Sequence, residues 1–381
     1  MSRRTVIVGA GAGGLAVAAE LHQRGVEFDL LERTGAVGAS WRSRYDSLRL
    51  HTARQLSGLP GLRIPRRFGS WVRRDDLVSY LEEYAARHRI TPQFGVEVTG
   101  VERMADGWRV ESTAGTYEAG AVVLATGLSR TPRIPAWPGL SSFTGDFVHS
   151  SAYRDPEPYR GKRVLVVGAG NSAAEVATEI SAIATDVRLS VRRPPNIVRR
   201  DLAGFPTQVF GIVLRRFPVP VVDALTSMLR RISVPNLSRY GLPGPMGDGF
   251  SQYLRSHTVP ILDHGFVAAI QTGAITVVPQ IASIDGPDVA LVDGRVLRPD
   301  AIVAATGFRP DLGGLVGGLG VLDEKGEPLI GGVHTAPEAP GLYLVGLNIV
   351  LSGLLREVGI EARAVGRTIA RTQSVETAAV R

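Results

Sequence analysis

The sequence predicts an α/β fold made of two similar parallel-sheet domains, with the second domain inserted into the first. Two short β-branched runs are each followed by a glycine-rich turn and an alanine-rich helical pattern, the order of a βαβ unit. Two later apolar runs each end in Ala-Thr-Gly. A strand at Leu342 to Val345, followed by a helix from about Leu354, indicates that the first domain is completed late in the chain.

The first glycine-rich turn follows the run Thr5 to Val8 and has the spacing G-x-G-x-x-G, at Gly9, Gly11 and Gly14. These glycines permit a tight turn, a close approach to a pyrophosphate, and close packing of helix on strand. The helix, expected over Leu15 to Leu21, turns its positive N-terminal end toward the phosphates. The next strand, FDLLE, ends at Glu32. Its carboxylate accepts hydrogen bonds from a ribose and repels a 2′-phosphate, which favours FAD or NAD at this site.

The pattern recurs after the run Val164 to Val167, where the three small-residue positions are Gly168, Gly170 and Ala173. The following strand, DVRLSVRR, ends in Arg192 and Arg193, at the place where the first unit has its acid. Guanidinium groups bind phosphate through charge and forked hydrogen bonds. The second site should therefore prefer NADP to NAD.

Together these patterns predict two Rossmann-like dinucleotide-binding domains, with the NADP domain inserted into the FAD domain. We expect the first part of the FAD domain over residues 1–145 and its completion over 301–381. The NADP domain should span 146–300, with a helical substrate-pocket insertion near 195–261. The Ala-Thr-Gly strands, Val122 to Leu128 and Ala301 to Pro310, should mark where the chain crosses between the domains.

The amino-acid composition excludes several classes of chemistry. The chain has no cysteine, which excludes disulfides, thiolate catalysis and a flavin disulfide reductase. The net charge is +7, but the arginines are scattered, which favours sites for anionic cofactors over nucleic-acid binding. No apolar run is long enough for a membrane span, and the N-terminus lacks a signal-peptide pattern. We expect a cytoplasmic protein without a metal site.

The stretch between the two loops, FTGDFVHSSAY, has the pattern F-x-G-x-x-x-H-x-x-x-[YF] at Phe143, Gly145, His149 and Tyr153. This fingerprint, with two dinucleotide loops in this order, resembles the class B flavin monooxygenases. The family includes the flavin-containing monooxygenases and the plant YUCCA-type enzymes, and the motif LRLH, Leu48 to His51, is similar to the latter. The resemblance extends from about Val6 to Ile369.

The resemblance implies an NADPH-dependent FAD monooxygenase. NADPH would reduce bound FAD, oxygen would add to form a flavin 4a-hydroperoxide, and retained NADP would shield it from water. One oxygen atom would then pass to a small organic substrate. The implied cofactors are FAD and NADPH, the partners are the substrate and molecular oxygen, and a homodimer is a further possibility.

The resemblance also implies cofactor contacts, position by position. For FAD they are Gly9, Gly11, Gly13, Gly14, Glu32, Arg33, Trp41, Arg42, His51 and Val98. For NADP they are Gly168, Gly170, Asn171, Ser172, Ala173, Arg192 and Arg193. Further cofactor contacts are Ala125, Thr126, Gly127, Gly307 and Leu354.

Three residues are candidates for a catalytic role: His51, His149 and Tyr153. His51 aligns with an asparagine that animal-type enzymes place near the flavin, so it either substitutes for that group or has a structural polar role. We interpret His149 as a polar tie between the two domains rather than a proton donor. Baeyer–Villiger relatives have tryptophan where Tyr153 stands, which argues against lactone or ester formation.

Several alternatives stay open at this stage. The region from Pro194 to about Ile261 either packs over the active site or forms a membrane-surface helix. The reaction is N- or S-oxygenation, or oxidative decarboxylation of a 2-oxo acid, with Baeyer–Villiger oxygenation as an alternative. A flavoprotein that oxidises NADPH and releases hydrogen peroxide would share every loop, and a non-enzymatic flavin-binding protein would share the first.

Overall fold

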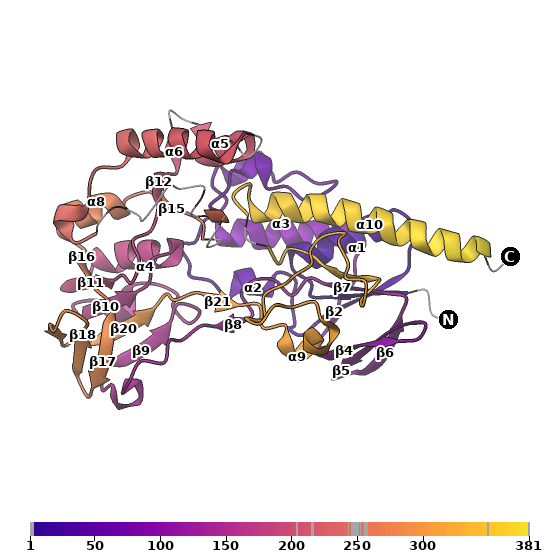
Figure 1. The fold of residues 1–381 in the computed structure, drawn as a ribbon, viewed down its shortest axis with the longest axis horizontal. Coiled ribbons are helices and arrows are strands. Elements are labelled where there is room, and N and C mark those ends of the chain that lie inside the picture. The colour runs from indigo at the N-terminus through magenta and orange to yellow at the C-terminus, as the bar shows by residue number, and fades with distance from the viewer. Residues whose placement is uncertain are drawn as a thin grey trace. The chain divides into compact units, whose positions relative to one another are not determined.

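The computed structural model describes residues 4–202, 205–214, 217–242, 244, 251, 253–254, 258–348 and 350–379. These residues form two compact units, each built around a parallel sheet (Figure 1). The first unit consists of Met1–Ser43, Leu48–Thr131 and Arg309–Arg381. The second unit consists of Arg44–Ser47 and Pro132–Phe308.

The sheet of the first unit has five parallel strands in the order β22-β7-β1-β2-β3. From one edge to the other they are β22 (Leu342–Leu344), β7 (Ala121–Leu124), β1 (Thr5–Val8), β2 (Phe28–Glu32) and β3 (Gln93–Phe94). The predicted runs Thr5 to Val8 and FDLLE form strands with those bounds. Strands buried on both faces are apolar throughout, as β1 and β7 are.

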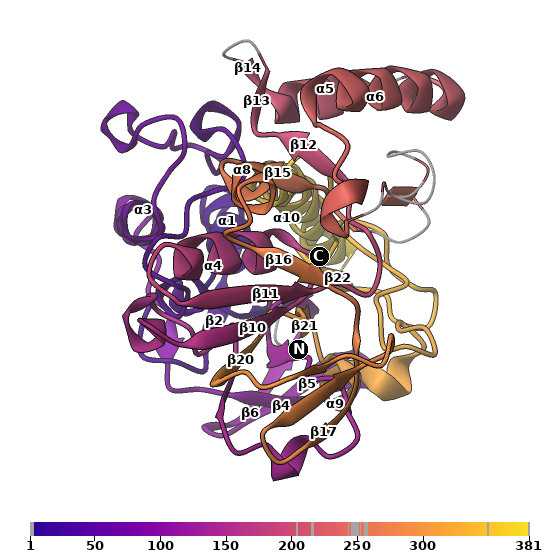
Figure 2. The same cartoon turned by 90° about the vertical axis from the view of Figure 1, so that its left-hand side faces the viewer.

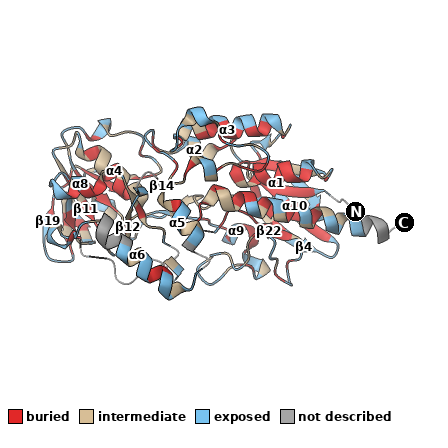
Figure 3. Ribbon diagram, turned by 90° about the horizontal axis from the view of Figure 1, so that it is seen from above, coloured by how far each residue is buried: buried red, intermediate tan, exposed pale blue. Residues whose placement is uncertain are grey.

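Helices cover one face of this sheet and a small sheet covers the other. The helices are α1 (Ala12–His22), α2 (Ala39–Arg42), α3 (Arg74–Arg87) and α10 (Leu354–Ala379). Figure 3 shows α1 buried along most of its length, because α3, α10 and the sheet surround it. The opposite face packs against α9 (Gly313–Val316) and an antiparallel sheet of β4 (Val98–Met104), β5 (Gly107–Ser112) and β6 (Gly115–Ala119).

The second unit repeats this plan. Its parallel sheet has the order β16 (Thr276–Val278), β11 (Asp186–Ser190), β10 (Arg163–Val167), β20 (Ala301–Ala304) and β9 (Asp146–His149). On one face α4 (Asn171–Ser181) packs on β11 and β10, with α8 (Phe266–Gln271) beside it (Figure 2). The other face packs on an antiparallel sheet of β17 (Ile281–Asp285), β18 (Asp288–Leu291) and β19 (Val296–Leu297).

The segment between β11 and α8 carries smaller elements of the second unit. Strand β12 (Ile197–Arg199) pairs with β15 (Ile261–Asp263), and β13 (Asp201–Leu202) pairs with β14 (Phe205–Pro206). Two helices follow, α5 (Thr207–Leu214) and α6 (Val219–Ser233). The expected insertion near 195–261 falls partly outside the described residues, and its role as a substrate pocket stays a prediction.

The boundaries between the units differ from the expected ones. Strand β20, expected in the completion of the first domain, is the fourth strand of the second sheet, so the chain returns to the first unit after Phe308 rather than at 301. The first crossing comes after Thr131 rather than at 145, because Trp137 and Phe143 pack on the core of the second unit. Short strands β8 (Thr131–Pro132) and β21 (Phe308–Arg309) pair where these crossings occur.

Candidate cofactor-binding sites

The glycines of the turn after β1 have different surroundings and therefore different roles. Gly9 has φ +102°, and a Cβ on it would lie 2.7 Å from the carbonyl oxygen of Ala125. A Cβ on Gly14 would lie 1.8 Å from the carbonyl oxygen of Gly9. Around Gly11, by contrast, no atom lies within 4 Å of the Cβ position. Gly9 and Gly14 are therefore required by the fold, whereas Gly11 borders open space that a ligand can use.

The N-terminus of α1 faces that open space. The helix begins after Gly11, which has no side chain to cap it, and its first described intrahelical bond runs from the Leu15 amide to the Gly11 carbonyl at 3.0 Å. The preceding amides lack partners within the helix. Gly13 brings this turn against the Ala125 side chain, which would lie 3.3 Å from a Cβ. The turn is thus a backbone cradle with a positive end, suited to a phosphate.

Glu32, at the end of β2, is buried beside this cradle. Its Oε2 accepts a hydrogen bond from the Ala10 amide at 2.8 Å, and its Oε1 accepts from the amide and the hydroxyl of Thr34 at 2.9 and 2.7 Å. A carboxylate has about four acceptor positions. Glu32 therefore holds the glycine turn in shape and retains acceptor capacity for the hydroxyls of a ribose.

The Ala-Thr-Gly turn after β7 lies directly across from the glycine turn. The Ala125 amide donates to the Val8 carbonyl at 2.9 Å, and Gly127 has φ +75°. Thr126 Oγ1 is buried and, among the described residues, has no hydrogen-bond partner. Buried hydroxyls are normally bonded, so an unsatisfied hydroxyl beside an open phosphate cradle fits a site for a polar ligand. This observation supports a dinucleotide at this position.

The remaining FAD candidates all lie within the first unit. Val98 is buried at the start of β4, and its neighbour Val96 donates its amide to the Glu32 carbonyl at 3.0 Å. Trp41 is half-buried in α2, and Leu354 is the first residue of α10. The other candidates are Arg33, which is exposed; Arg42, which pairs with Glu82; and His51, which is half-buried.

The second unit has the same construction at the end of β10. Gly168 has φ +150°, and a Cβ on it would lie 2.3 Å from the carbonyl oxygen of Ala305. Gly170 caps α4, and no atom lies within 4 Å of its Cβ position. Ala305 follows β20 and donates its amide to Val167 at 2.8 Å, as Ala125 does to Val8. Ala173 is buried at the third small-residue position. Each cradle thus opens between the strand that precedes the glycine turn, β1 or β10, and an Ala-Thr-Gly strand.

Asn171 and Ser172, both expected among the NADP contacts, use their side chains within the protein. Asn171 Nδ2 donates to the Pro260 carbonyl at 3.2 Å, and its Oδ1 accepts the Leu262 amide at 2.8 Å, so this side chain fastens β15 to α4. The Ser172 hydroxyl bonds to the phenol of Tyr45. Both side chains are thus engaged within the protein. What the two residues can offer a phosphate is their backbone amides in the first turn of α4.

Arg192 and Arg193 follow β11, and both are exposed. The strand registers correct the expected equivalence by one residue: Val8 pairs with Leu31 and Val167 pairs with Ser190, so Val191, not Arg192, occupies the position of Glu32. The second cradle therefore lacks the carboxylate and is followed by two cations. This pattern is electrostatically suited to a phosphate on the ribose.

The fingerprint residues all lie within the second unit. Phe143 packs on its core, and a Cβ on Gly145 would lie 2.6 Å from the Asp300 carbonyl oxygen, so glycine lets the chain pass close to β20. Tyr153 is 1% exposed, and its hydroxyl donates to Glu179 Oε2 on α4 at 2.9 Å. Burial and Glu179 raise the pKa of the phenol, which keeps it neutral. The Tyr153 side chain thereby anchors the segment after β9 to α4.

His149 holds the Ala-Thr-Gly turn of the second sheet. Its Nε2 lies 3.0 Å from the Gly307 carbonyl oxygen, so Nε2 carries a proton and donates it. Its Nδ1 accepts the Ser151 amide at 3.1 Å, so Nδ1 is unprotonated. Burial lowers the pKa of the ring, consistent with this neutral tautomer. Both bonds lie within the second unit, so they do not form the tie between domains that we expected.

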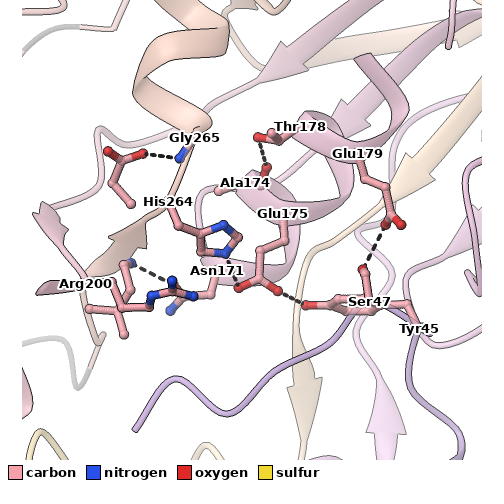
Figure 4. A network of polar contacts seen from close by, with 12 residues as sticks. Tyr45, Ser47, Asn171, Ala174, Glu175, Thr178, Glu179, Arg200, His264 and Gly265 are labelled. Atoms are coloured by element: carbon pink, nitrogen blue, oxygen red, sulfur yellow. Dashed lines mark hydrogen bonds and ion pairs between the residues drawn. The ribbon is translucent and has the colours of Figure 1, made fainter. Parts of the chain in front are cut away.

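The sequence reasoning missed a polar network on α4 (Figure 4). The segment Arg44–Ser47 belongs to the second unit, and Tyr45 donates its hydroxyl to Glu175 while Ser47 donates to Glu179 at 3.0 Å. His264 Nε2 lies 3.4 Å from the other Glu175 oxygen, and this bond raises the pKa of the imidazole. These partners lie up to 132 residues apart, so no local sequence pattern reveals them.

Two further searches concern the described residues alone. Within them, no group of three or more histidine, cysteine, aspartate or glutamate side chains is placed to hold a metal ion. The same part of the chain contains no helix with both the length and the apolar character that a bilayer span requires.

Comparison with known proteins gives consistent results. A protein-family model described as "Pyridine nucleotide-disulphide oxidoreductase" matches residues 6–202; the disulphide of that description has no counterpart here, because the chain lacks cysteine. The chain is 33% identical over 356 residues to the probable indole-3-pyruvate monooxygenase YUCCA3 of Arabidopsis thaliana, covering 90% of this chain and 82% of that protein. It is 35% identical over 314 residues to the indole-3-pyruvate monooxygenase YUCCA1 of Oryza sativa subsp. japonica, covering 81% and 77%.

Solved structures share the fold. A flavin-containing monooxygenase from Stenotrophomonas maltophilia superposes with a TM-score of 0.74 at 23% identity, covering 97% of this chain and 99% of that one. The open crystal structure of a cyclohexanone monooxygenase gives a TM-score of 0.72 at 18% identity, covering 98% and 88%. At these identities the similarity establishes the α/β architecture with two parallel sheets.

Gly11→Ala and Gly14→Ala should fail in different ways. The methyl group at position 11 enters open space, so the protein should keep its secondary structure but lose bound FAD, and its melting temperature should match that of FAD-free wild type. The methyl group at position 14 meets backbone, and such overpacking costs about 1–3 kcal/mol or more, so the melting temperature should fall. Gly35→Ala, also in open space, is the control. Wild-type flavin content in Gly11→Ala would show that Gly11 does not face the cofactor.

His149→Asn should change the pH dependence of stability. The pKa of His149 is lowered in the folded state, below its unfolded value of about 6.5, so its stabilising contribution is present above that pH and lost as the pH falls. The difference in melting temperature between wild type and His149→Asn should therefore be largest near pH 8 and shrink toward pH 5. His334→Asn, at an exposed histidine, is the control. A difference that does not vary with pH contradicts this assignment.

Arg192→Ala combined with Arg193→Ala should raise the KM for NADPH about tenfold or more, because charge-assisted hydrogen bonds contribute about 1.5–3 kcal/mol. The KM for NADH should change little. Steady-state kinetics with both coenzymes measures this. The charge-matched control is Arg295→Ala with Arg298→Ala, two exposed arginines in surface ion pairs of the same unit. Equal effects on both coenzymes would argue against a 2′-phosphate contact.

Proposed function

The chain belongs to the class B flavin monooxygenase family, and from that premise we propose that it catalyses the oxidative decarboxylation of a 2-oxo acid. It is a flavin-dependent monooxygenase with FAD and NADP(H) as cofactors. Relatives named indole-3-pyruvate monooxygenases align along 81–90% of its length at 33–35% identity. That extent of similarity supports the same class of substrate, with indole-3-pyruvate as the first compound to test.

One observation carries the assignment of two cofactors to two sites: the same cradle occurs in both units with opposite charge beside it. In the first unit the buried carboxylate of Glu32 adjoins the turn, and in the second Val191 takes its place and two exposed arginines follow. A carboxylate accepts from ribose hydroxyls and repels a 2′-phosphate, whereas arginine attracts one. We therefore assign FAD to the first cradle and NADPH to the second.

The residues of the first cradle would hold FAD mainly through backbone. The amides after Gly11 would bind the pyrophosphate, Glu32 would accept from the ribose, and the Thr126 hydroxyl would gain the partner it lacks. Arg33, Trp41, Arg42, His51, Val98 and Leu354 remain proposed contacts of the same cofactor. Bound FAD supplies the redox chemistry, taking two electrons from NADPH and activating dioxygen.

The second cradle would hold NADPH by the same means. The first-turn amides of α4, after Gly170, would bind its pyrophosphate, while Arg192 and Arg193 bind the 2′-phosphate. His149 would keep the turn at Gly307 in place through its Nε2–H, and Tyr153 would fix α4 through Glu179. These two residues position the coenzyme's cradle and do not transfer protons to substrate.

The proposed reaction balances with these two cofactors. One 2-oxo acid, one O₂, one NADPH and one proton give the carboxylic acid shorter by one carbon, CO₂, water and NADP⁺. One oxygen atom enters the new carboxyl group and the other leaves as water. The C–C bond between the two carbonyl carbons breaks, which releases the original carboxylate as CO₂.

Product analysis tests the proposal. Purified enzyme with FAD and NADPH should convert indole-3-pyruvate to the acid with one carbon fewer, with one NADPH oxidised per CO₂ released, and ¹⁸O₂ should place one label in the product. Gly11→Ala should abolish the conversion, whereas Gly35→Ala should not. Oxygenated amines, sulfides or ketones without decarboxylation would redirect the substrate assignment, and stoichiometric hydrogen peroxide with every compound would replace it by an NADPH oxidase.

A further inference from the structure

A stripe of large apolar side chains is exposed along α5 and α6 of the second unit. The exposed fractions reach 52% at Val213, 50% at Phe217 and 61% at Met228. We call the following set the apolar stripe: Val209, Phe210, Val213, Phe217, Val221, Leu225 and Met228. Large apolar side chains exposed together on neighbouring elements often mark a binding surface.

Helix α6 carries large apolar side chains on its exposed face. Val221, Leu225 and Met228, at helical spacing, are exposed, and Figure 3 shows the exposed residues along this helix. The buried side includes Asp223, whose carboxylate accepts hydrogen bonds from the amide and hydroxyl of Ser251. The buried side also includes Val222, which is 1% exposed, so α6 carries apolar side chains on both its buried and its exposed face. This arrangement fits a helix whose apolar face is covered by a partner outside the unit.

The charge of the surrounding sequence indicates what covers the stripe. Without Arg192 and Arg193, which are assigned to the coenzyme, residues 194–240 contain seven arginines and two aspartates, a surplus of five positive charges. Of the two aspartates, Asp223 is buried and Asp201 pairs with Arg200 at 3.6 Å. The partner should therefore be apolar in its interior and anionic at its surface.

We propose that α5 and α6 dock on the surface of an anionic lipid bilayer. The apolar stripe would enter the boundary between headgroups and acyl chains, and the positive charge of this stretch of sequence would favour anionic headgroups. A second copy of this chain fits less well, because the same segment of the other molecule carries the same positive charge. The proposal concerns the bilayer surface, not a span, and goes beyond the reaction proposed above.

Vesicle co-sedimentation tests the proposal. The protein with FAD and NADP⁺ is mixed with vesicles of phosphatidylcholine, alone or with about 30% phosphatidylserine. We expect at least about tenfold stronger partitioning to the anionic vesicles, since each arginine near such a surface contributes several-fold, and a decline with added salt. A triple variant, Val221→Gln with Leu225→Gln and Met228→Gln, removes three apolar side chains from the boundary. Its partition coefficient to anionic vesicles should be at least about tenfold lower than that of the wild type.

The matched control is Val292→Gln with Val296→Gln, because these side chains are similarly exposed, at 53% and 57%, elsewhere in the second unit. It should bind vesicles as the wild type does. If the triple variant has a lower melting temperature or flavin content, Met228→Gln alone replaces it, with a smaller loss expected. Equal partitioning of wild type and stripe variant overturns the proposal, as does absence of binding to anionic vesicles. So does a concentration-dependent dimer that the stripe variant abolishes without any vesicle binding.

Discussion

Backbone packs directly against backbone where β1 and β10 turn toward the helices that follow them, and the rest of both units depends on that contact. At Gly9 and at Gly168, a Cβ would collide with the carbonyl oxygen of the adjoining Ala-Thr-Gly strand, at 2.7 and 2.3 Å. Only glycine allows the two chains to approach so closely with φ at +102° and +150°. The helix that follows each turn begins directly after Gly11 or Gly170, so its first amides face the open space there.

Once the cradle is built from backbone, its selectivity has to come from side chains at its rim. The two units show how little must change. Glu32 supports its turn through the Ala10 amide and presents a carboxylate, whereas Val191 at the equivalent position presents no charge and is followed by arginines. The scaffold is therefore common to both sites, and electrostatics distinguishes them. The fingerprint residues also have a structural role, because they hold β9 at one edge of the second sheet.

The local parts of this architecture could be predicted from sequence, and the long-range parts could not. The glycine spacing and β-branched runs predicted β1 and β2 with the bounds observed, as well as the start of α10 at Leu354. The family and its two cofactors were also predicted correctly. The domain boundary expected at residue 301 was wrong, because the sequence of an apolar strand does not indicate which of the two sheets it joins. The side-chain partners of Asn171 and Ser172, near positions 261 and 45, could not be predicted because they are distant in sequence.

The four residues Arg44–Ser47 limit how far the second unit can be treated as a module. The unit is encoded in two pieces, and the shorter piece supplies the phenol for Glu175 and the hydroxyl for Glu179. A fragment containing Pro132–Phe308 alone would leave these two half-buried carboxylates without those donors, and burial already raises the pKa of Glu179. Domain exchange between relatives would meet the same obstacle. An autonomous version of this unit, or a chimaera, would have to include residues Arg44–Ser47 or replace the two hydroxyl donors that they supply.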